Sequence, residues 1–183
     1  MLVGLLGLQG AFMDHIPHLE RLGAAVAVVR HRKGLQGIDR LILPGGESTV
    51  MAKFLQADAM VGALKERIEA GMPVWGVCAG AILLAREVDG APGLLGALPI
   101  AVTRNAYGRQ GDSRRSGIEI PLLHEGTYPA SFIRAPRVDR LEAGVCVHAS
   151  LDGDPVFLQF ERIMATTFHP ELNPDSPFHR YFL

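Results

Sequence analysis

One cysteine stands in a setting typical of a catalytic nucleophile. Cys78 lies between two glycines, in Gly76-Val77-Cys78-Ala79-Gly80, directly after the apolar run 72–75. Flanking glycines suit a sharp turn from a strand into a helix, because the missing side chains let the backbone fold back and expose the nucleophile. A lone cysteine is more often a small buried hydrophobe. Here the glycines and the helical run 81–86 favour a reactive thiol.

A histidine and a carboxylate further along could activate that thiol. Thr167-Phe168-His169-Pro170-Glu171 places an imidazole and a carboxylate two positions apart. Because Pro170 disfavours helix at His169, we expect an extended chain, in which residues i and i+2 point to the same side. His169 alone could merely end a strand and hydrogen-bond locally. With Glu171 beside it, the pattern predicts a general base and the group that orients it, completing a triad with Cys78.

A glycine-rich turn could stabilise the charge that such chemistry creates. In Leu43-Pro44-Gly45-Gly46-Glu47-Ser48-Thr49 the glycines could expose backbone N–H groups. One of them, at Gly46, could hold an oxyanion together with the amide of Ala79. The simpler interpretation is a tight turn in which Ser48 or Thr49 caps the next helix.

The remaining cysteine and histidines suggest no further chemistry. Cys146 has no glycine elbow and alternates within a strand pattern, so we interpret it as a core residue. His15 and His18 share a helical face, but no third ligand lies nearby, so we expect solvated side chains and no metal site. No usable pattern surrounds the remaining histidines, at positions 31, 124, 148 and 179.

The elements that must position these residues alternate between strands and helices. Apolar runs predict strands at 2–8, 24–30, 41–44 and 74–77, and periodicity predicts helices at about 12–22, 48–55, 59–70 and 81–86. This order predicts an α/β fold with a flavodoxin-like, three-layer, mostly parallel sheet, in one domain over residues 1–183. Shorter runs at 118–123, 131–133, 144–149, 155–160 and 163–168 predict antiparallel strands added to the same sheet.

The topology also predicts where the reactive residues meet. In open α/β sheets, ligands bind beyond the carboxyl ends of the strands. Gly45, Cys78 and His169 each follow a predicted strand, so we expect all three at that edge.

Composition narrows the possible partners. The 183 residues are 48% hydrophobic and 20% charged, enough for one sizeable core. A net charge of −1 without runs of like charge predicts no nucleic-acid or anionic membrane partner. No apolar stretch approaches the length of a membrane span, and residues 1–8 are expected to be a buried strand and not a secretion signal. Two cysteines without a disulfide framework predict a cytoplasmic location.

Together these motifs resemble a known family. The Cys78 elbow and His169-Pro170-Glu171 are similar to the triad of the class I, cysteine-dependent glutamine amidotransferases. Four more segments resemble the glutaminase subunits of pyridoxal 5′-phosphate synthase complexes: Gly7-Leu8-Gln9-Gly10, the 43–49 turn, Arg104-Asn105-Ala106-Tyr107-Gly108-Arg109-Gln110 and Phe132-Ile133-Arg134-Ala135-Pro136. The resemblance spans residues 2–172.

The resemblance implies a role for each matching position. It makes Cys78 the nucleophile, His169 the base and Glu171 its partner in hydrolysing L-glutamine to glutamate and ammonia, without a cofactor or a metal. It implies that ammonia passes to a synthase subunit that makes pyridoxal 5′-phosphate. The glutamine-binding residues it implies are Gly46, Glu47, Ser48, Arg104, Ile133 and Arg134, and the residues near the synthase contact are Gln9 and Gly10.

Other functions remain open from the sequence. The chain could be a glutaminase that supplies a different synthase, for example in histidine or purine synthesis. It could be a cysteine peptidase or a chaperone-like protein with the same elbow, although those would not explain His-Pro-Glu. It could also be a silent binding module, which the complete triad argues against.

Overall fold

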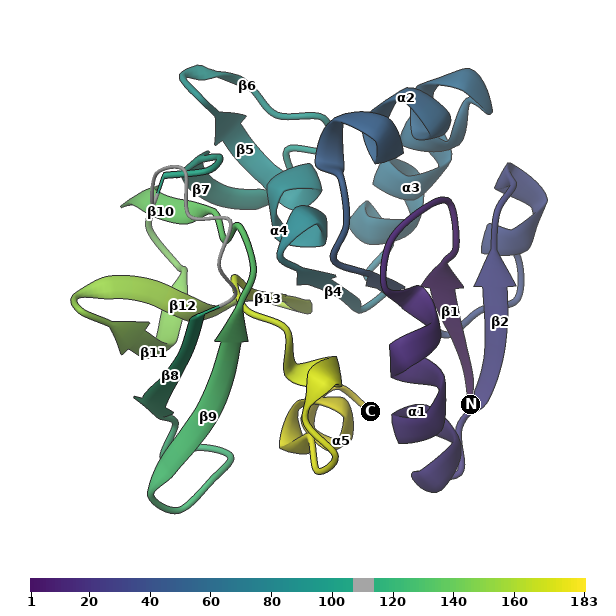
Figure 1. Ribbon diagram of the computed structural model, residues 1–183. Coiled ribbons are helices and arrows are strands. Elements are labelled where there is room, and N and C mark those ends of the chain that lie inside the picture. The colour runs from purple at the N-terminus through teal and green to yellow at the C-terminus, as the bar shows by residue number, and fades with distance from the viewer. Residues whose placement is uncertain (107–113) are drawn as a thin grey trace.

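A seven-stranded sheet runs through the molecule (Figure 1). The computed structural model describes residues 1–106 and 114–183. In spatial order the strands are β11 (Cys146–Leu151), β12 (Asp154–Phe160), β13 (Ile163–Thr166), β4 (Val74–Val77), β3 (Arg40–Leu43), β1 (Leu2–Leu6) and β2 (Ala25–Val29). From β13 to β2 every pairing is parallel, whereas β12 is antiparallel to both of its neighbours. The sheet is therefore mostly parallel with an antiparallel addition on one side, as the sequence predicts.

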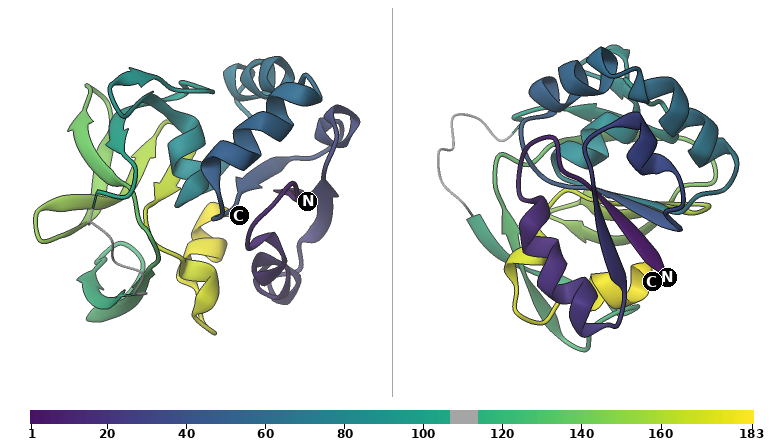
Figure 2. Two further views of the ribbon diagram at one scale, coloured as in Figure 1. Left: turned by 45° about the horizontal axis from the view of Figure 1, so that its top comes forward. Right: turned by 90° about the vertical axis from the view of Figure 1, so that its right-hand side faces the viewer.

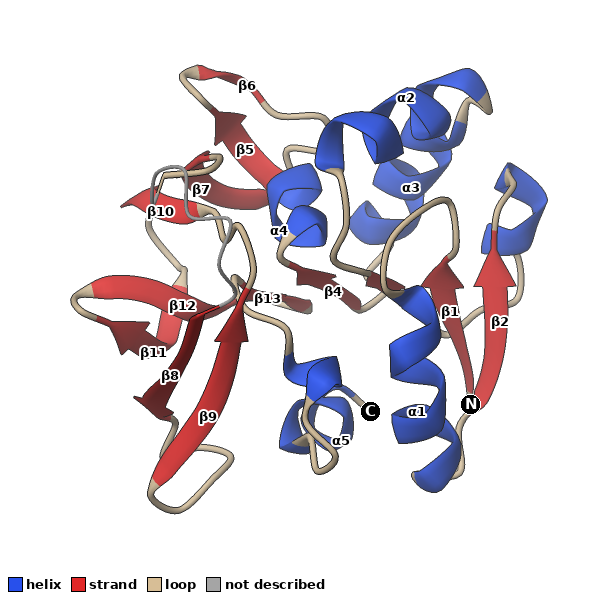
Figure 3. Ribbon diagram, viewed as in Figure 1, coloured by secondary structure: helices blue, strands red, loops and turns tan. Residues whose placement is uncertain are grey.

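Helices cover both faces of this sheet, which makes three layers (Figures 2 and 3). One face carries α2 (Ser48–Ala57), α3 (Met60–Glu69) and α4 (Ala79–Leu84), and the other carries α1 (Ile16–Arg21) and α5 (Pro177–Phe182). Three short 3₁₀ helices complete the set: η1 (Phe12–His15), η2 (Arg32–Leu35) and η3 (Pro170–Leu172). Among the described residues, no helix has both the length and the apolar composition needed to cross a membrane.

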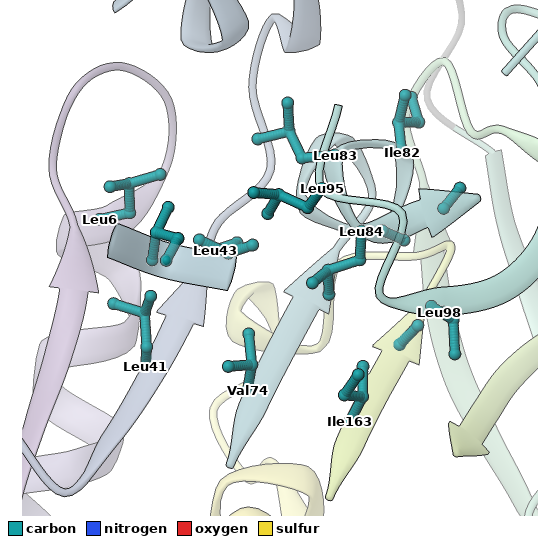
Figure 4. Packing of buried hydrophobic residues seen from close by; sticks show 14 of the residues in the cluster. Leu6, Leu41, Leu43, Val74, Ile82, Leu83, Leu84, Leu95, Leu98 and Ile163 are labelled. Atoms are coloured by element: carbon teal, nitrogen blue, oxygen red, sulfur yellow. The ribbon is translucent and has the colours of Figure 1, made fainter. Parts of the chain in front are cut away.

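The strands bury side chains on both faces, so the sheet separates two hydrophobic cores. Because successive side chains of a strand point to opposite faces, Leu41 and Leu43 enter the core under α2–α4, and Ile42 enters the core beside α1 and α5. Figure 4 shows the first core, in which Val74 and Leu84 pack beside Leu41 and Leu43. Continuous apolar strands are what a sheet covered on both faces requires.

Two smaller sheets depart from the sequence prediction. The helix after Cys78 ends at Leu84, not at residue 86, and the chain continues as a strand. Strands β5 (Ala85–Val88), β6 (Ala91–Pro92), β7 (Leu98–Thr103) and β10 (Arg137–Leu141) form a separate four-stranded sheet, and β8 (Arg114–Glu119) pairs with β9 (Thr127–Phe132) alone. Of the predicted antiparallel strands, those at 144–149 and 155–160 are β11 and β12, which join the main sheet antiparallel. The prediction was wrong for 118–123 and 131–133, which overlap β8 and β9 and pair only with each other, and for 163–168, because β13 lies parallel to β4. The sheet that contains β5 was not predicted, because α4 carries the chain off the main sheet and β5 pairs there with β7.

Candidate active site

Cys78 occupies the predicted turn between β4 and α4. Its backbone has φ 48° and ψ −99°, a conformation that a residue with a side chain adopts only at a cost of about 1–3 kcal/mol. Both nearby glycines are required because neighbouring backbone atoms approach them too closely to leave room for a side chain. A Cβ at Gly76 would lie 2.7 Å from the amide nitrogen of Ala81, and one at Gly80 would lie 1.9 Å from the carbonyl oxygen of Leu43. The glycines therefore let α4 start against β4 and β3 with Cys78 at its N-terminal end.

His169 and Glu171 follow β13, the strand next to β4, and their side chains meet. His169 Nδ1 lies 2.7 Å from Glu171 Oε1. The local backbone differs from the expectation, since Pro170–Leu172 form the 3₁₀ helix η3 and only His169 precedes it in a non-helical conformation. The extended chain predicted at Glu171 is therefore wrong, although the side-chain contact forms. A proline at the first position of a helix loses no hydrogen bond, because the N–H there has no partner within the helix.

The electrostatics of this pair favour a charged histidine. Burial lowers the pKa of His169, but hydrogen bonds to Cys78 and Glu171 and the charges of both groups outweigh burial and raise it to about 10. Burial raises the pKa of Glu171, but the hydrogen bond from His169 and the charges of His15 and His169 bring the pKa below its usual value. Near neutral pH the pair is therefore an imidazolium and a carboxylate. Nδ1 is held by Glu171, which leaves Nε2 for the thiol of Cys78.

The turn between β3 and α2 packs directly against the histidine ring. A Cβ at Gly45 would lie 2.3 Å from His169 Cε1, so only glycine fits there. Residues after β1 hold this turn from the other side: the Ala11 N–H donates to the Gly45 carbonyl over 3.0 Å, and the Glu47 N–H donates to Gln9 Oε1 over 2.7 Å. A Cβ at Gly10 would lie 1.9 Å from the Gly45 carbonyl oxygen. The predicted partner-sensing residues thus support the turn.

The expected helix cap is absent from this turn. Glu47, not Ser48 or Thr49, precedes the first residue of α2, and no side chain caps the helix. The capping interpretation is wrong because Ser48 is already the first helical residue. Its buried side chain lines the pocket described next.

A pocket of about 220 Å³ opens in front of the thiol. Its walls include Cys78, His169 and all six predicted glutamine-binding residues, Gly46, Glu47, Ser48, Arg104, Ile133 and Arg134. Cys78 Sγ lies 3.7 Å from the Ile133 carbonyl oxygen. Gln9, Gly10 and Ala79 do not line the pocket. Of these, Gln9 and Gly10 lie behind the Gly45 turn, and Ala79 begins α4.

Two arginines face this pocket, and other residues hold them in place. Arg104 forms an ion pair with Asp89 (Nε–Oδ2, 2.6 Å) and donates to Thr49 Oγ1 over 3.0 Å. Hydrogen bonds from the backbone and side chain of Arg104 lower the pKa of Asp89. Arg134, at φ 46°, pairs with Glu47 over 3.4 Å.

Sequence reasoning missed some of these supporting residues. Asp89 has no motif around it, whereas Thr49 lies inside the Gly-Gly-Glu-Ser-Thr segment and could have been included. Asn105 also lines the pocket. Of the segment 104–110, residues 107–110 lie outside the described residues.

The structure corrects what the sequence predicts for three other side chains. Cys146 is exposed at the start of β11 and is not a core residue. His15 and His18 are buried, not solvated, because η1 and α1 pack against α5 and η3. In the described part of the chain, no group of three or more His, Cys, Asp or Glu side chains is arranged to hold a metal ion.

The arrangement belongs to a class of hydrolases that work through a covalent thiol intermediate, with a nucleophile, a base and an orienting carboxylate at the carboxyl edge of a parallel sheet. Comparison with known proteins gives the family. The family model described as "SNO glutamine amidotransferase family" matches residues 5–183. The chain belongs to this family and is a glutamine amidotransferase.

Individual relatives match over their whole length. The chain is 45% identical over 189 residues to the pyridoxal 5′-phosphate synthase subunit PdxT of Herpetosiphon aurantiacus, covering 100% of this chain and 99% of that protein. It is also 45% identical to the PdxT of Thermotoga maritima, covering 100% and 98%. A crystal structure of a glutamine amidotransferase superposes with a TM-score of 0.92 at 43% identity, over 99% of this chain and 96% of that one. PurLQS from Thermotoga maritima shares the fold with a TM-score of 0.73 at 16% identity, over 99% and 95%.

Proposed function

We propose that this chain is a single-domain glutaminase that hydrolyses L-glutamine to glutamate and ammonia and supplies the ammonia to a pyridoxal 5′-phosphate synthase subunit. The observation that carries the proposal is the pairing of His169 with Glu171 beside the buried Cys78 thiol, in a pocket of about 220 Å³. The full-length match to synthase subunits supports the destination of the ammonia.

The first half-reaction releases ammonia. The Cys78 thiolate attacks the side-chain amide carbon of glutamine and forms a tetrahedral oxyanion, which the Ala79 N–H and the Gly46 N–H stabilise. The C–N bond then breaks, and the His169 imidazolium donates its Nε2 proton to the departing nitrogen. Ammonia leaves, and the glutamyl group remains as a thioester on Cys78.

The second half-reaction restores the enzyme. Neutral His169 takes a proton from water, and the resulting hydroxide adds to the thioester carbon. Collapse of this intermediate expels the Cys78 thiolate and yields glutamate. Glu171 keeps the imidazole ring oriented through both steps and stabilises its charged form.

The pocket walls suit the rest of the substrate. A free glutamine carries an α-carboxylate, for which a guanidinium is the preferred partner, and an α-ammonium, which needs a carboxylate or carbonyl. Arg104 and Arg134 supply the first kind of group, and Glu47 with the Ile133 carbonyl supplies the second. Ser48 and Gly46 complete the wall nearest the thiol. This chemistry needs no metal or organic cofactor.

We further propose that the synthase subunit controls the glutaminase through Gln9 and Gly10. Both touch the Gly45–Gly46 turn, which contributes an oxyanion donor, and a glycine pair can change its peptide orientation at little steric cost. We place the reaction in the cytoplasm, where a thiol stays reduced, and we expect no nucleic-acid partner.

The test measures ammonia release with and without the synthase subunit at saturating glutamine. Since one oxyanion donor is worth about 10²–10³-fold in turnover, the isolated chain should be slower than the complex by that order. Gln9→Ala should weaken the activation, whereas Gln36→Ala, at an exposed glutamine outside the pocket, should not. Equal turnover with and without the partner would refute the control mechanism. Absence of glutamine hydrolysis in the complex, or preference for a peptide substrate, would refute the proposed function.

A further inference from the structure

The carboxylate of Asp89 binds the backbone and the side chain of Arg104 at the same time. Asp89 Oδ1 accepts from the Arg104 backbone N–H over 2.9 Å, and Oδ2 accepts from Arg104 Nε–H over 2.6 Å. From the other side, Arg104 Nη1 donates to Thr49 Oγ1 over 3.0 Å. Because one carboxylate bridges the main chain and the side chain of the same residue, it restricts rotation about the side-chain bonds between them.

The backbone of the small sheet brings Asp89 to this position. β5 and β7 are parallel and pair Val88 with Val102, so Asp89 and Arg104 follow strand ends at the same edge. Residues 89 and 90 form the two-residue turn between β5 and β6, with φ 52° at Asp89 and 77° at Gly90. A type I′ turn needs positive φ at both positions, which Asp-Gly, Asn-Gly and Gly-Gly adopt readily. The Asp89 N–H donates to the Val102 carbonyl over 2.9 Å, which ties the turn to the strand that carries Arg104.

These contacts leave donors of the guanidinium for a ligand. Arg104 and Thr49 line the pocket in front of Cys78, whereas Asp89 is not among the lining residues. Asp89 occupies Nε–H and Thr49 occupies one N–H of Nη1, and no described residue accepts from Nη2. Nη2 and the other N–H of Nη1 therefore remain. Neighbouring N–H groups of a guanidinium are the donors that bind both oxygens of a carboxylate.

The other arginine of the pocket is arranged differently. Arg134 Nη1 lies 3.4 Å from Glu47 Oε2, and both residues line the pocket, so the charge of Arg134 is balanced within the wall. Asp89 meets Arg104 from outside the lining. The Asp89 and Arg104 side chains are 36% and 41% exposed, and an ion pair so open to solvent contributes little to stability. Its effect is therefore on the direction of the guanidinium.

We propose that Asp89 is a positioning residue that fixes Arg104 for the α-carboxylate of glutamine and thereby sets the preference for free L-glutamine over glutamine with a blocked α-carboxylate. The inference rests on the proposed function, in which glutamine is the substrate. A guanidinium that is already oriented loses less conformational freedom when it binds the carboxylate. Because the α-carboxylate is remote from the reacting amide, the gain is the same for bound substrate and transition state. It lowers KM and leaves kcat unchanged.

Two substitutions remove this support and keep the turn. Asp89→Gly removes the carboxylate, and Asp89→Asn leaves one amide oxygen, which can accept one of the two bonds. Both new residues fit the positive φ. In the complex with the synthase subunit, KM for L-glutamine should rise roughly tenfold in Asp89→Gly and roughly threefold in Asp89→Asn, with kcat within about twofold. An unchanged KM in Asp89→Gly would overturn the proposal.

A second substrate separates positioning from general damage to the pocket. L-Glutaminamide carries the same side-chain amide and no α-carboxylate, and its hydrolysis is followed by mass spectrometry as formation of glutamate α-amide. Asp89→Gly should leave kcat/KM for glutaminamide within about twofold, so the preference for L-glutamine should fall roughly tenfold. Equal losses with both substrates would contradict the proposal, because they would show that the pocket as a whole is disturbed.

The chain offers a matched control for the turn. Asp152 and Gly153 form a two-residue turn between β11 and β12 with φ 53° and 90°, and Asp152 pairs with Arg114 over 3.4 Å. Asp152→Gly should leave KM for L-glutamine unchanged, since Asp152 does not line the pocket. In an Arg104→Ala background, Asp89→Gly should raise KM no further, because the two residues act as one unit. A further tenfold rise in that background would refute the action through Arg104.

A binding measurement decides the role of Asp89 without turnover. L-Glutamine is titrated calorimetrically into the Cys78→Ala chain in complex with the synthase subunit, and Asp89→Gly should raise the dissociation constant roughly tenfold. If the unsubstituted complex binds L-glutamine without hydrolysing it, the proposed function fails and the titration still tests Asp89. If the complex hydrolyses L-glutamine and Asp89→Gly leaves the dissociation constant unchanged, the inference fails and the proposed function stands.

Discussion

Gly45→Ala should inactivate the enzyme although it adds one methyl group outside the triad. The new Cβ would lie 2.3 Å from His169 Cε1 and 2.9 Å from Nδ1, where ordinary contacts are 3.4–4 Å. The ring must therefore withdraw by about 1 Å. In the conformation that the structure shows, the Gly45 carbonyl is bonded to Ala11 and packed against Gly10, so the ring and not the turn is expected to move. No left-handed φ is required at Gly45, so the effect isolates the ring contact.

The expected loss follows from the geometry of the base. A displacement of about 1 Å at a catalytic group costs on the order of 10²-fold in rate, so kcat of Gly45→Ala should fall by about that factor. Overpacking of a buried contact should also cost about 1–3 kcal/mol of unfolding free energy. The assay is ammonia release in the complex with the synthase subunit, together with urea unfolding.

A second glycine provides the control for this substitution. Gly62 lies within α3 with nothing within 4 Å of its added Cβ, so Gly62→Ala should stabilise the chain by about 1 kcal/mol and leave kcat unchanged. A Gly45→Ala enzyme with unchanged kcat would refute the conclusion that the turn fixes His169.

Three further predictions concern the triad and the histidines behind it. Cys78→Ala should abolish ammonia release, whereas Cys146→Ser should retain it; substantial activity in Cys78→Ala would contradict the thioester route. His169→Ala should lose about 10²–10⁴-fold in rate, Glu171→Gln should lose less, and the double variant should be little worse than His169→Ala; multiplying losses would show separate functions. Because burial lowers the pKa of His15 from 6.5 to about 4, its contribution to stability is present above pH 6.5 and lost as the pH falls toward 4, about 3 kcal/mol in all. The free energy of unfolding measured with urea should therefore already decrease between pH 7 and pH 5. An unchanged free energy of unfolding over that range would contradict this prediction.

The sequence was most informative where the determinants are local. The elbow needs two glycines within five residues, and His169 and Glu171 are two positions apart, so both patterns are visible in a short window. The order of strands then placed these segments at one edge of the sheet. The backbone at Glu171 was not predictable in the same way, because η3 and an extended chain both bring the two side chains together.

Other features depend on contacts between distant segments. His15 and His179 are 164 residues apart, and neither has neighbours that distinguish a buried histidine from a solvated one. The separate sheet formed by β5, β6, β7 and β10 depends on where α4 ends and the chain leaves the main sheet. The periodicity of the sequence does not reveal that point. Cys146 alternates with apolar residues as a core residue would, but β11 is the edge strand and its first residue faces solvent.

The contact between Gly80 and the Leu43 carbonyl has a consequence for protein engineering. Because a Cβ at Gly80 would lie 1.9 Å from that oxygen, the start of α4 and the end of β3 are in close steric contact and fit only each other's backbone. A designer who grafts the cysteine elbow onto another α/β scaffold must therefore transplant the end of the neighbouring strand as well. The smallest transferable unit is the pair of adjacent strand ends with both of their turns, and the five-residue motif by itself would not carry the nucleophile's geometry into a new host.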